Sequence, residues 1–388
     1  MFRMSEEYDY IIAGAGLSGL SLAIRLADPK FANKRVLIVD QSKKDTNDRT
    51  WSFWQLKSQR RFIDIIYKSW NKLKFYGPDV DRSFDTDPYV YHTIKGIDFY
   101  KYAFEIIEGA SNITFLLGSV GEIRNAGDHV LVEVEEKTFK ADYVFDSIVR
   151  SFPKSDKLFV WQHFMGWELT MEEEVFDKEE ATFMDFRVPQ ESDVRFVYVL
   201  PFTEKKALVE ATLFSKEIAD KELYEEMLRD YLESYYPNKK YTIDQVELGA
   251  IPMTSASFSK GEDRIIPIGT NNGTVKPSSG YAFVRIQEES DSLIHNLEKG
   301  VFNPIKRSAR FSAYDKTLLN VLLTEKVSGQ RVFGDMFKYN DPSLILKFLD
   351  ERTSIIEEAG FFKTLPIISF TRAFIEEQWR TLTERKQE

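Results

Sequence analysis

A glycine-rich turn between an apolar strand and a helix most constrains what this chain can fold into. The apolar run Tyr8 to Ala13 is typical of a buried strand, and Gly14-Ala15-Gly16-Leu17-Ser18-Gly19 follows it directly. Leu20 to Ala27 then has the apolar spacing of a helix, and Arg35 to Val39 is a second apolar strand that ends at Asp40. This order predicts a βαβ unit of the kind that binds dinucleotides.

Each glycine of the turn has its own physical reason. Gly14 permits the tight turn, Gly16 lets the backbone approach a pyrophosphate, and Gly19 lets the helix pack closely on the strand. The N-terminus of the helix offers free N–H groups and the positive end of its dipole to phosphates. Asp40 stands where an acidic side chain hydrogen-bonds an adenosine ribose. These residues predict a bound dinucleotide, and by themselves they do not distinguish FAD from NAD.

The composition excludes several classes of function. The net charge of −10, from 52 Lys and Arg against 62 Asp and Glu, argues against a nucleic-acid surface. The chain has no cysteine, and its four histidines form no close pair, so we expect no metal site. No apolar run approaches the roughly 18 to 20 residues that span a bilayer, and no signal peptide is evident. We therefore expect a cytoplasmic protein whose contact with a membrane is peripheral.

The rest of the chain predicts a β-rich middle and a helical tail. The tail is expected to be mostly amphipathic helix over 304–380, and strand-like alternation extends over 158–213. Other expected elements are short strands or loops over 73–93, a helix capped by Asp98, strands at 113–117, 129–135 and 143–148, a helix at 221–235, a strand at 265–268 and a helix at 280–297.

An unusual tryptophan-rich stretch, Asn47-Asp48-Arg49-Thr50-Trp51-Ser52-Phe53-Trp54, lies just past the βαβ unit. Further marked stretches are Gln162–Trp167, Phe183–Arg187, Tyr198–Phe202, Ala207–Thr212, Gly249–Thr254, Lys276–Gln287 and Phe348–Glu351. In this order, and over nearly the whole chain, the set resembles the FAD-dependent carotenoid lycopene cyclase family, specifically its bacterial-type lycopene β-cyclases.

The resemblance implies an α/β (α+β) fold with three parts. The first is a discontinuous, Rossmann-like FAD-binding domain of the hydroxylase–reductase flavoprotein type, over 1–72, 95–150 and 249–300. A β-rich substrate-binding domain covers 73–94 and 151–248, and a helical C-terminal region covers 301–388. The domains are therefore expected to interleave along the chain.

The same resemblance places a second flavin-contacting segment at Ile268 to Tyr281, where a strand end leads through a glycine-bearing loop to a helix. It implies cofactor contacts from Gly269, Lys276, Ser278 and Gly280, beside those of the turn and Asp40. Many flavoproteins of this group have Gly-Asp at the strand end, whereas this chain has Gly269-Thr270, so the contact from that Asp to the ribitol does not carry over. Arg49 is expected either to contact the flavin or its phosphates or to have a structural role.

Glu210 is the main candidate for a catalytic acid. In a strand over 207–214 its neighbours on the same face are Leu208, Thr212 and Phe214. Burial among such neighbours raises the pKa of a carboxyl and lets it act as a general acid near neutral pH. The family places an essential glutamate in a Phe-Leu-Glu-Glu-Thr-like motif whose first Glu matches Glu210, while its second Glu is replaced by Ala211 here.

Other site residues leave alternatives open. Asp185 and Arg187 share one face of a strand-like run, as a structural ion pair or with Asp185 as a second catalytic carboxylate. His163 is expected to be structural. Trp51 and Trp54 either line a polyene pocket or pack in a core. The resemblance adds three further substrate-binding aromatics: Trp167, Phe183 and Phe186.

The implied reaction is the non-redox cyclisation of linear lycopene ends to β-rings, through γ-carotene to β-carotene, by an isomerase (intramolecular lyase). The implied cofactor is reduced FAD, with NAD(P)H as its reductant, and the final base is the flavin, Glu210 or Asp185. Expected partners are lycopene or a related acyclic carotene and the lipid surface, which the tail helices contact through residues such as Phe361, Phe362, Ile367 and Phe370. Alternatives are an FAD-dependent monooxygenase or polyprenyl reductase acting on an isoprenoid, and a carotenoid-binding scaffold without turnover.

Overall fold

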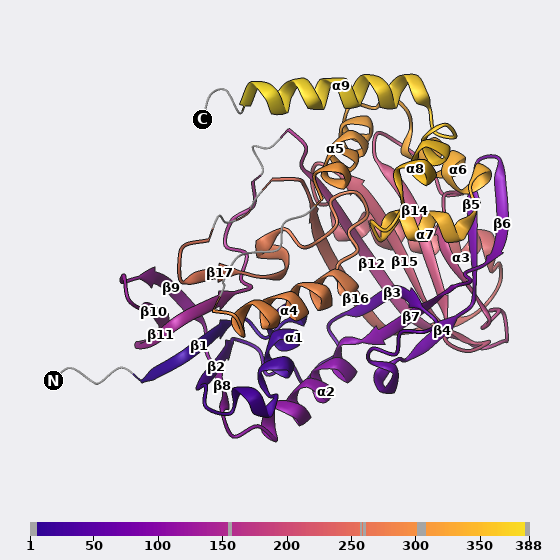
Figure 1. The fold of residues 1–388 in the computed structure, drawn as a ribbon. Coiled ribbons are helices and arrows are strands. Elements are labelled where there is room, and N and C mark those ends of the chain that lie inside the picture. The colour runs from indigo at the N-terminus through magenta and orange to yellow at the C-terminus, as the bar shows by residue number, and fades with distance from the viewer. Residues whose placement is uncertain (1–5, 154–156, 257, 259–260, 301–307, 385–388) are drawn as a thin grey trace.

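The structure of the chain is a computed structural model. It describes residues 6–153, 157–256, 258, 261–300 and 308–384. It contains two large sheets, one small sheet and a group of helices near the C-terminus (Figure 1). Within the described residues, no helix is both long enough and apolar enough to cross a bilayer.

The first large sheet carries the predicted βαβ unit. Its strands lie in the order β8 (Ile113–Leu117), β2 (Val36–Asp40), β1 (Glu7–Ala13), β11 (Lys137–Asp146), β10 (Val130–Val134) and β9 (Val120–Asn125), and β17 (Ile265–Pro267) pairs with β11. Strands β8, β2, β1, β11 and β17 pair with one another in parallel, whereas β10 pairs antiparallel with both β11 and β9. Helices α1 (Leu17–Leu26), α2 (Gly96–Glu108) and α4 (Phe283–Leu297) share one core with this sheet. Because β1 is buried on both faces, its apolar run is continuous rather than alternating.

The second large sheet is mostly antiparallel. Its order is β16 (Tyr241–Met253), β12 (Val160–Met171), β15 (Lys206–Ser215), β14 (Val194–Pro201), β13 (Glu180–Asp185), β5 (Lys72–Gly77) and β6 (Val80–Asp85). Helix α3 (Lys221–Tyr235) packs on one face. The small sheet joins β3 (Thr50–Leu56), β7 (Tyr89–Lys95) and β4 (Lys68–Trp70). Short 3₁₀ turns are η1 (Pro29–Phe31), η2 (Ile63–Ile65) and η3 (Gly269–Asn272).

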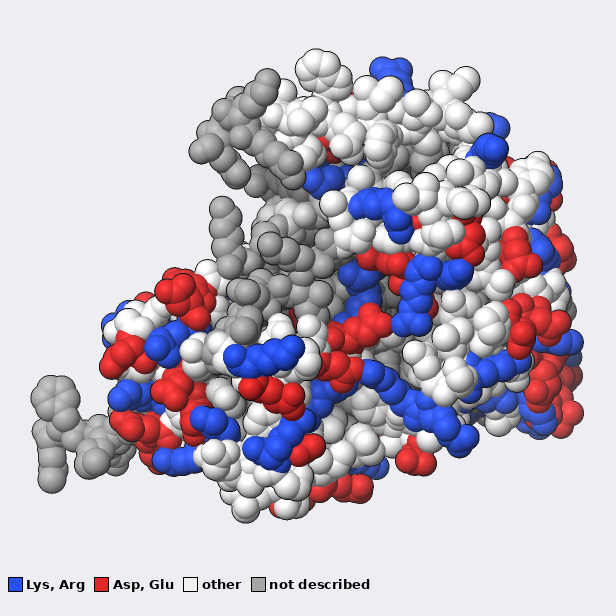
Figure 2. Space-filling model, in the orientation of Figure 1, with Lys and Arg blue, Asp and Glu red and all other residues white. Residues whose placement is uncertain are grey.

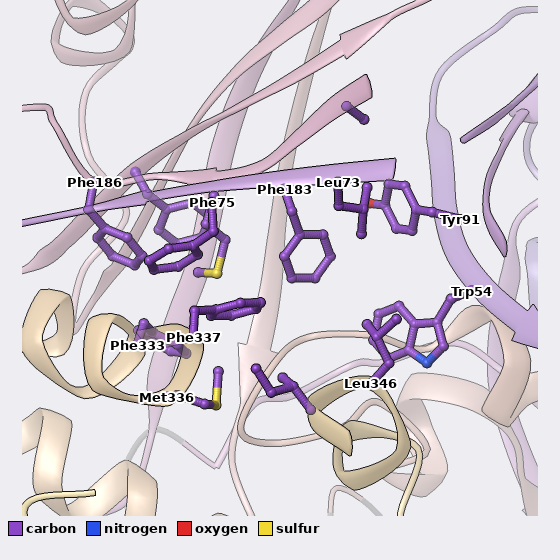
Figure 3. Close-up of a cluster of buried hydrophobic side chains, with 14 of the residues drawn as sticks. Trp54, Leu73, Phe75, Tyr91, Phe183, Phe186, Phe333, Met336, Phe337 and Leu346 are labelled. Atoms are coloured by element: carbon purple, nitrogen blue, oxygen red, sulfur yellow. The ribbon is translucent and has the colours of Figure 1, made fainter. Parts of the chain in front are cut away.

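In the part of the chain that the structure describes, five helices follow α4: α5 (Ala309–Leu323), α6 (Gly329–Tyr339), α7 (Pro342–Leu349), α8 (Ile355–Phe362) and α9 (Ile367–Glu384). They cover the other face of the second sheet through an aromatic core, in which Phe75 and Phe337 stack at 4.3 Å between ring centroids (Figures 1 and 3). Alternate residues of each strand therefore face α3 on one side and this aromatic core on the other.

The structure agrees with most predicted elements and corrects several. The helix at 221–235 has the predicted bounds, and the tail is helical wherever it is described, although 301–307 lie outside the described residues. Asp98 is not a cap: α2 begins at Gly96, so Asp98 lies within the first turn, where its charge favours the helix dipole. The predicted helix at 280–297 begins only at Phe283, and β3, β4, β9 and β16 were not predicted. Much of β16 is exposed and lacks a strong apolar pattern, which explains that omission.

The predicted division into domains stays a prediction. The small sheet pairs β3 with β7, and these strands come from segments that the prediction assigned to different domains. This pairing places the tryptophan-rich stretch between the two large sheets.

Candidate functional site

The glycine-rich turn has the backbone geometry that a dinucleotide requires. Gly14 has a φ of +96°, which disfavours other residues, and a Cβ on Gly19 would lie 1.9 Å from the carbonyl oxygen of Gly14. A Cβ on Gly16 would meet no atom within 4 Å, so this side of the turn is open. No side chain caps α1, which leaves the N-terminal N–H groups of the helix to a ligand. The Asp40 carboxylate lies beside the turn and accepts a hydrogen bond from Ala15 N at 2.6 Å.

The downstream loop that was predicted to contact the flavin is held by Glu289 of α4. The Glu289 carboxylate accepts hydrogen bonds from Gly269 N (2.7 Å), Asn272 Nδ2 (2.7 Å) and Thr274 Oγ1 (2.6 Å). Gly269 has a φ of +61° and lies against Ser18 of α1, where a Cβ would approach the Ser18 Cβ to 2.6 Å. Glu289 therefore keeps this loop against the glycine-rich turn.

Two residues predicted to bind the cofactor are placed elsewhere. Lys276 is buried, and its Nζ lies 3.0 Å from Asp315 Oδ1 and 3.0 Å from Glu351 Oε1, so its charge is taken up by carboxylates of the C-terminal region. Ser278 is buried facing the helical tail, beside Tyr314 and Asp315. These two side chains therefore contact the protein itself, whereas other residues of the loop, such as Thr270 and Gly280, line the cavity. A cofactor contact from Lys276 or Ser278 stays a prediction.

One cavity of about 440 Å³ joins the turn to the predicted catalytic acid. Gly16, Leu17 and Ser18 line it on one side, and Glu210 of β15 lines it on another. Within the described residues Glu210 is the one carboxylate in this lining. The other lining residues are mostly apolar or aromatic and include Trp51, Tyr91, Phe152, Phe164, Tyr198, Leu200, Leu208, Ile251, Tyr281 and Phe283, beside Arg49 and Gly280.

Glu210 has the environment that the strand pattern predicted. Val209 and Ala211 face the core beneath α3, whereas Leu208 and Phe214 belong to the aromatic core on the opposite face. Burial, and after it the charge of the nearby Glu247, raise the pKa of Glu210 to about 8, against a hydrogen bond from Thr212 Oγ1 at 3.1 Å. The carboxyl is therefore protonated at neutral pH and can donate its proton into the cavity.

Three tyrosines surround the Glu210 side of the cavity: Tyr91, Tyr198 and Tyr281. Burial raises the pKa of Tyr91 to about 12 and raises the pKa of Tyr198 and Tyr281 well above the usual range. All three remain neutral phenols, whose ring faces attract cations. Sequence reasoning missed them because they come from three distant segments, of which only two lie in motifs that it quoted.

Four of the five predicted substrate-binding aromatics do not line the cavity. Trp54, Phe183 and Phe186 belong to the aromatic core beneath the C-terminal helices (Figure 3), and Trp167 packs on the α3 side of the sheet. The alternation of their strands turns them away from this cavity, and a contact of these four with the substrate stays a prediction. Trp51, on the opposite face of β3 from Trp54, does line the cavity.

Asp185 forms a buried ion pair with Arg187, with Nη2 to Oδ2 at 2.6 Å and Nε to Oδ1 at 2.9 Å. Tyr231 of α3 donates a hydrogen bond to the same carboxylate at 2.8 Å. Asp185 does not line the cavity, so the structural alternative fits its position and the catalytic one does not. His163 is also structural: its ring nitrogens contact the hydroxyls of Tyr224 and Ser215, and burial lowers its pKa to about 4.

Glu289 and Glu247 are functional candidates that sequence reasoning missed. A signal existed for Glu289, because it lies on the apolar face of α4, three residues after Ile286 and four before Leu293. Glu247 had no such signal, since its buried position depends on the strand that pairs with it.

The cavity fits a flavin dinucleotide in the chemistry of its polar groups. The buried polar atoms in its lining that have no hydrogen-bond partner among the described residues include Ser18 Oγ, Gln162 Oε1 and Ser279 Oγ. Together with the open face at Gly16 and the uncapped α1, they match a ligand that is polar at the turn. Within the described part of the chain, no group of His, Asp and Glu has the arrangement of a metal site.

Comparisons with known proteins show which sequences and folds the chain resembles. The sequence profile of the family described as "Lycopene cyclase protein" matches residues 9–375. The chain is 26% identical over 310 residues to a lycopene beta-cyclase of Paracoccus sp. (strain N81106 / MBIC 01143), covering 73% of this chain and 72% of that protein. It is 24% identical over 290 residues to a lycopene beta-cyclase of Pantoea ananas, covering 72% of each. A flavoprotein/dehydrogenase from Cytophaga hutchinsonii has a similar fold, with a TM-score of 0.63, 12% identity and coverage of 96% of this chain and 100% of that one.

Proposed function

Because the chain belongs to the lycopene cyclase family, we propose that it is a lycopene beta-cyclase, an isomerase that closes the linear ends of lycopene to β-rings. The product is γ-carotene after one ring and β-carotene after two. One observation carries this proposal: Glu210, kept protonated by burial, faces an aromatic cavity that also opens at the dinucleotide turn.

The residues of the cavity suit an acid-started ring closure. Glu210 donates its proton to C2 of the linear end, which leaves a tertiary cation at C1. The C5=C6 double bond attacks C1, closing the six-membered ring and moving the charge to C5, and loss of a proton from C6 gives the β-ring. The faces of Tyr91, Tyr198 and Tyr281 stabilise these cations, and the apolar lining keeps out water that would trap them.

FAD is the cofactor that this cavity suits best, since a dinucleotide turn occurs here in a flavoprotein fold. Gly14, Gly16 and Gly19 with the N-terminus of α1 would hold the pyrophosphate, and Asp40 would hold the adenosine ribose. Thr270 and Gly280, in the loop held by Glu289, would lie beside the flavin, and Arg49 would balance negative charge. A flavin reduced by NAD(P)H would supply negative charge that stabilises the cation. Substrate and product are isomers, so NAD(P)H is not consumed in proportion to product.

The substrate enters from a lipid surface that the C-terminal helices contact. Ile368, Ile375, Trp379 and Leu382 are exposed and lie 7, 4 and 3 residues apart, which puts them on one face of α9. Figure 2 shows mainly uncharged atoms around α9 at the top of the molecule, in contrast to the charged lower part. This face replaces part of the predicted contact set, because Phe361 is buried and Phe362 and Phe370 are half-buried, whereas Ile367 is exposed.

The function is tested by anaerobic incubation of the protein with FAD, NADPH and lycopene in liposomes, followed by chromatography and mass spectrometry. We expect a product of unchanged mass with the retention and spectrum of β-carotene. Glu210→Gln should lower its formation by at least about 100-fold, the scale of a lost general acid. The matched control is Glu133→Gln, on an exposed position of β10, which should leave the rate unchanged.

Other products would identify another chemistry of the same fold. A product heavier by one oxygen, once air is admitted, would indicate a monooxygenase, and one heavier by two hydrogens for each reduced bond would indicate a polyprenyl reductase. Unchanged lycopene in every condition, with tight binding of the carotene, would indicate a scaffold without turnover. Each of these results would overturn the role proposed for Glu210.

A further inference from the structure

Two glutamates face each other across a glycine in the second sheet. In β12, Gly166 pairs directly with Glu210 of β15 on one side and with Glu247 of β16 on the other. Directly paired residues of antiparallel strands project from the same face, so both carboxyls lie on the cavity side. Neighbouring strands are about 4.8 Å apart, which puts the two Cα atoms about 10 Å apart, a span that two glutamate side chains cover directly or through one water.

The absence of a side chain at Gly166 keeps the space between these carboxyls free. A Cβ there would lie 2.9 Å from Leu208 Cδ1, 3.2 Å from Glu247 Cγ and 3.4 Å from Glu247 Oε1. A larger residue would therefore press on Leu208 and Glu247 and take up the space between the two carboxyls. This arrangement agrees with the electrostatics of the pair, since Glu247 raises the pKa of Glu210.

Glu247 is buried and is held by one hydrogen bond, from Thr50 Oγ1 to Oε2 at 3.0 Å. The ionisable groups that face it are Glu210 from β15, Glu168 from β12, Lys95 from β7 and Arg49 from the segment before β3. Burial, together with Glu168, raises its pKa to about 7, whereas Lys95, Arg49 and the Thr50 hydrogen bond oppose the rise. Glu247 therefore exchanges a proton readily near neutral pH.

A chain of ion pairs leads from Glu168, a neighbour of Glu247, to the surface. Glu168 is the diagonal neighbour of Glu247, two residues after Gly166 on the same face of β12. It pairs with Lys95 at 2.8 Å and with Lys206 at 2.7 Å, and Lys206 pairs with Asp244 at 3.1 Å. The exposed fraction of these side chains rises from 9% at Glu168 to 30% at Lys206 and 33% at Asp244. Ionisable groups thus continue from the cavity wall to solvent.

We propose that Glu247 returns a proton to Glu210 after each ring closure, drawing it from solvent through Glu168 and its lysine partners. Glu247 acts through Glu210 and does not need to touch the substrate. The protons balance: Glu210 gives one to C2, the relay restores one to Glu210, and the one that leaves C6 returns to solvent. The inference rests on the proposed function for its place in the cycle, while the exchange of protons between the two glutamates is a property of the protein itself.

That exchange is measured without substrate by infrared spectroscopy of the FAD-loaded protein. The C=O band of protonated Glu210, assigned with Glu210→Gln, shifts when its proton is replaced by deuterium after transfer into D₂O. In Glu247→Gln we expect this shift to be at least about 10-fold slower than in the wild type. Glu247→Asp should restore much of the rate, and Glu133→Gln should match the wild type. An unchanged exchange rate in Glu247→Gln would overturn the relay, even if the protein cyclised no lycopene.

Turnover gives the second test. In Glu247→Gln, the first ring closure per enzyme should keep its rate within about two-fold, because Glu210 starts protonated, and later turnovers should slow at least about 10-fold. A structural role would instead slow the first and later turnovers equally, and that result would overturn the proposal. If the wild type forms no β-carotene while infrared exchange still depends on Glu247, the proposed function fails and the relay stands.

Discussion

Glu210 owes its chemistry to the residues on its own face of β15. A carboxyl in water is ionised at neutral pH, and this one is not, because apolar and aromatic side chains surround it and a second carboxyl lies across Gly166. The general acid is thus produced by its position in the strand rather than by a special partner. The reaction should therefore slow as the pH rises above about 8, where Glu210 loses its proton.

The raised pKa of Glu210 also makes the stability of the fold depend on pH. Folding keeps a proton on this carboxyl that the unfolded chain releases above pH 4 to 5, so its contribution is complete in acid and is lost as the pH rises toward about 8. Glu210→Gln removes this dependence, because the amide never ionises. We expect the variant to melt a few degrees above the wild type at pH 9 and within one degree of it at pH 5, measured by calorimetry. Equal melting temperatures at pH 9 would mean that ionisation of Glu210 hardly lowers the free energy of unfolding.

The burial of Glu210 was predictable from the residues next to it in the strand. The positions of Glu247, Lys276 and Ser278 were not predictable in this way. Alternation along one strand is enough to put Leu208, Glu210 and Phe214 on the same face. The position of Glu247 depends instead on how β16 pairs with β12, and the sequence of β16 contains no strong strand pattern. Lys276 and Ser278 lie in a motif that the sequence analysis associated with the cofactor, yet their side chains face the C-terminal region, which no local pattern reveals.

Helices and loops far apart in the chain are joined by the buried charge of Lys276. Its loop borders the cavity, while its carboxylate partners come from α5 and from the turn after α7, and Arg285 of α4 also pairs with Glu351 at 2.9 Å. An ion pair this deep is a weak source of net stability, but removal of one partner is costly because the opposing charges stay buried. The helical tail and the flavin-side loop therefore depend on each other.

Lys276→Met tests this dependence. We expect the free energy of unfolding in urea to fall by about 3 to 5 kcal/mol, since Asp315 and Glu351 lose a cation in a dry setting. FAD should also be released more easily, which a fluorescence titration detects. The matched control is Lys30→Met, because Lys30 pairs with Glu298 at 2.7 Å on the surface and should contribute little. If both variants were equally stable, the buried cluster would be incidental to the fold.

Elements with a regular apolar period were predicted best. The helix α3 has charged residues on one face and Tyr224, Leu228 and Tyr231 on the other, and its predicted bounds hold. Strands that depend on distant partners were missed or misplaced, and the aromatic stretches show why. Trp51 and Trp54 look alike in sequence, but the pairing of β3 with β7 turns one toward the cavity and the other into the core.

Exposed apolar side chains gather at one end of the molecule, as expected for a protein whose proposed substrate is dissolved in a membrane. The exposed apolar stripe of α9 lies at one end of the molecule (Figure 2), and side chains of α9, α8 and α6 enclose a separate apolar cavity of about 340 Å³ beneath it. Large apolar side chains exposed in one stripe mark a docking surface. In this protein, Ile368 is 86% exposed and Trp379 is 68% exposed.

Binding to liposomes tests the role of this stripe. Ile368→Glu combined with Trp379→Glu should lower the fraction of protein that sediments with the vesicles by at least about five-fold, even at high salt, because apolar insertion supplies most of the affinity. The control Leu117→Glu changes an exposed apolar residue of β8, on the other large sheet. Turnover of detergent-solubilised lycopene should be the same for all three proteins. Undiminished sedimentation of the double variant would place the contact on another face.

Among the described residues, Glu210 is the one carboxylate that lines the cavity at the glycine-rich turn, and this has a consequence for the proposed substrate, whose two ends are identical. Each visit closes one ring, so the half-finished molecule must withdraw, turn end for end and return before the second ring forms. Ring closure is then distributive. The ratio of one-ringed to two-ringed carotene reports how fast the one-ringed molecule rebinds to the cavity relative to how fast it diffuses away into the membrane. Dilution of the membrane with empty lipid should raise that ratio without any change in the chemistry at Glu210.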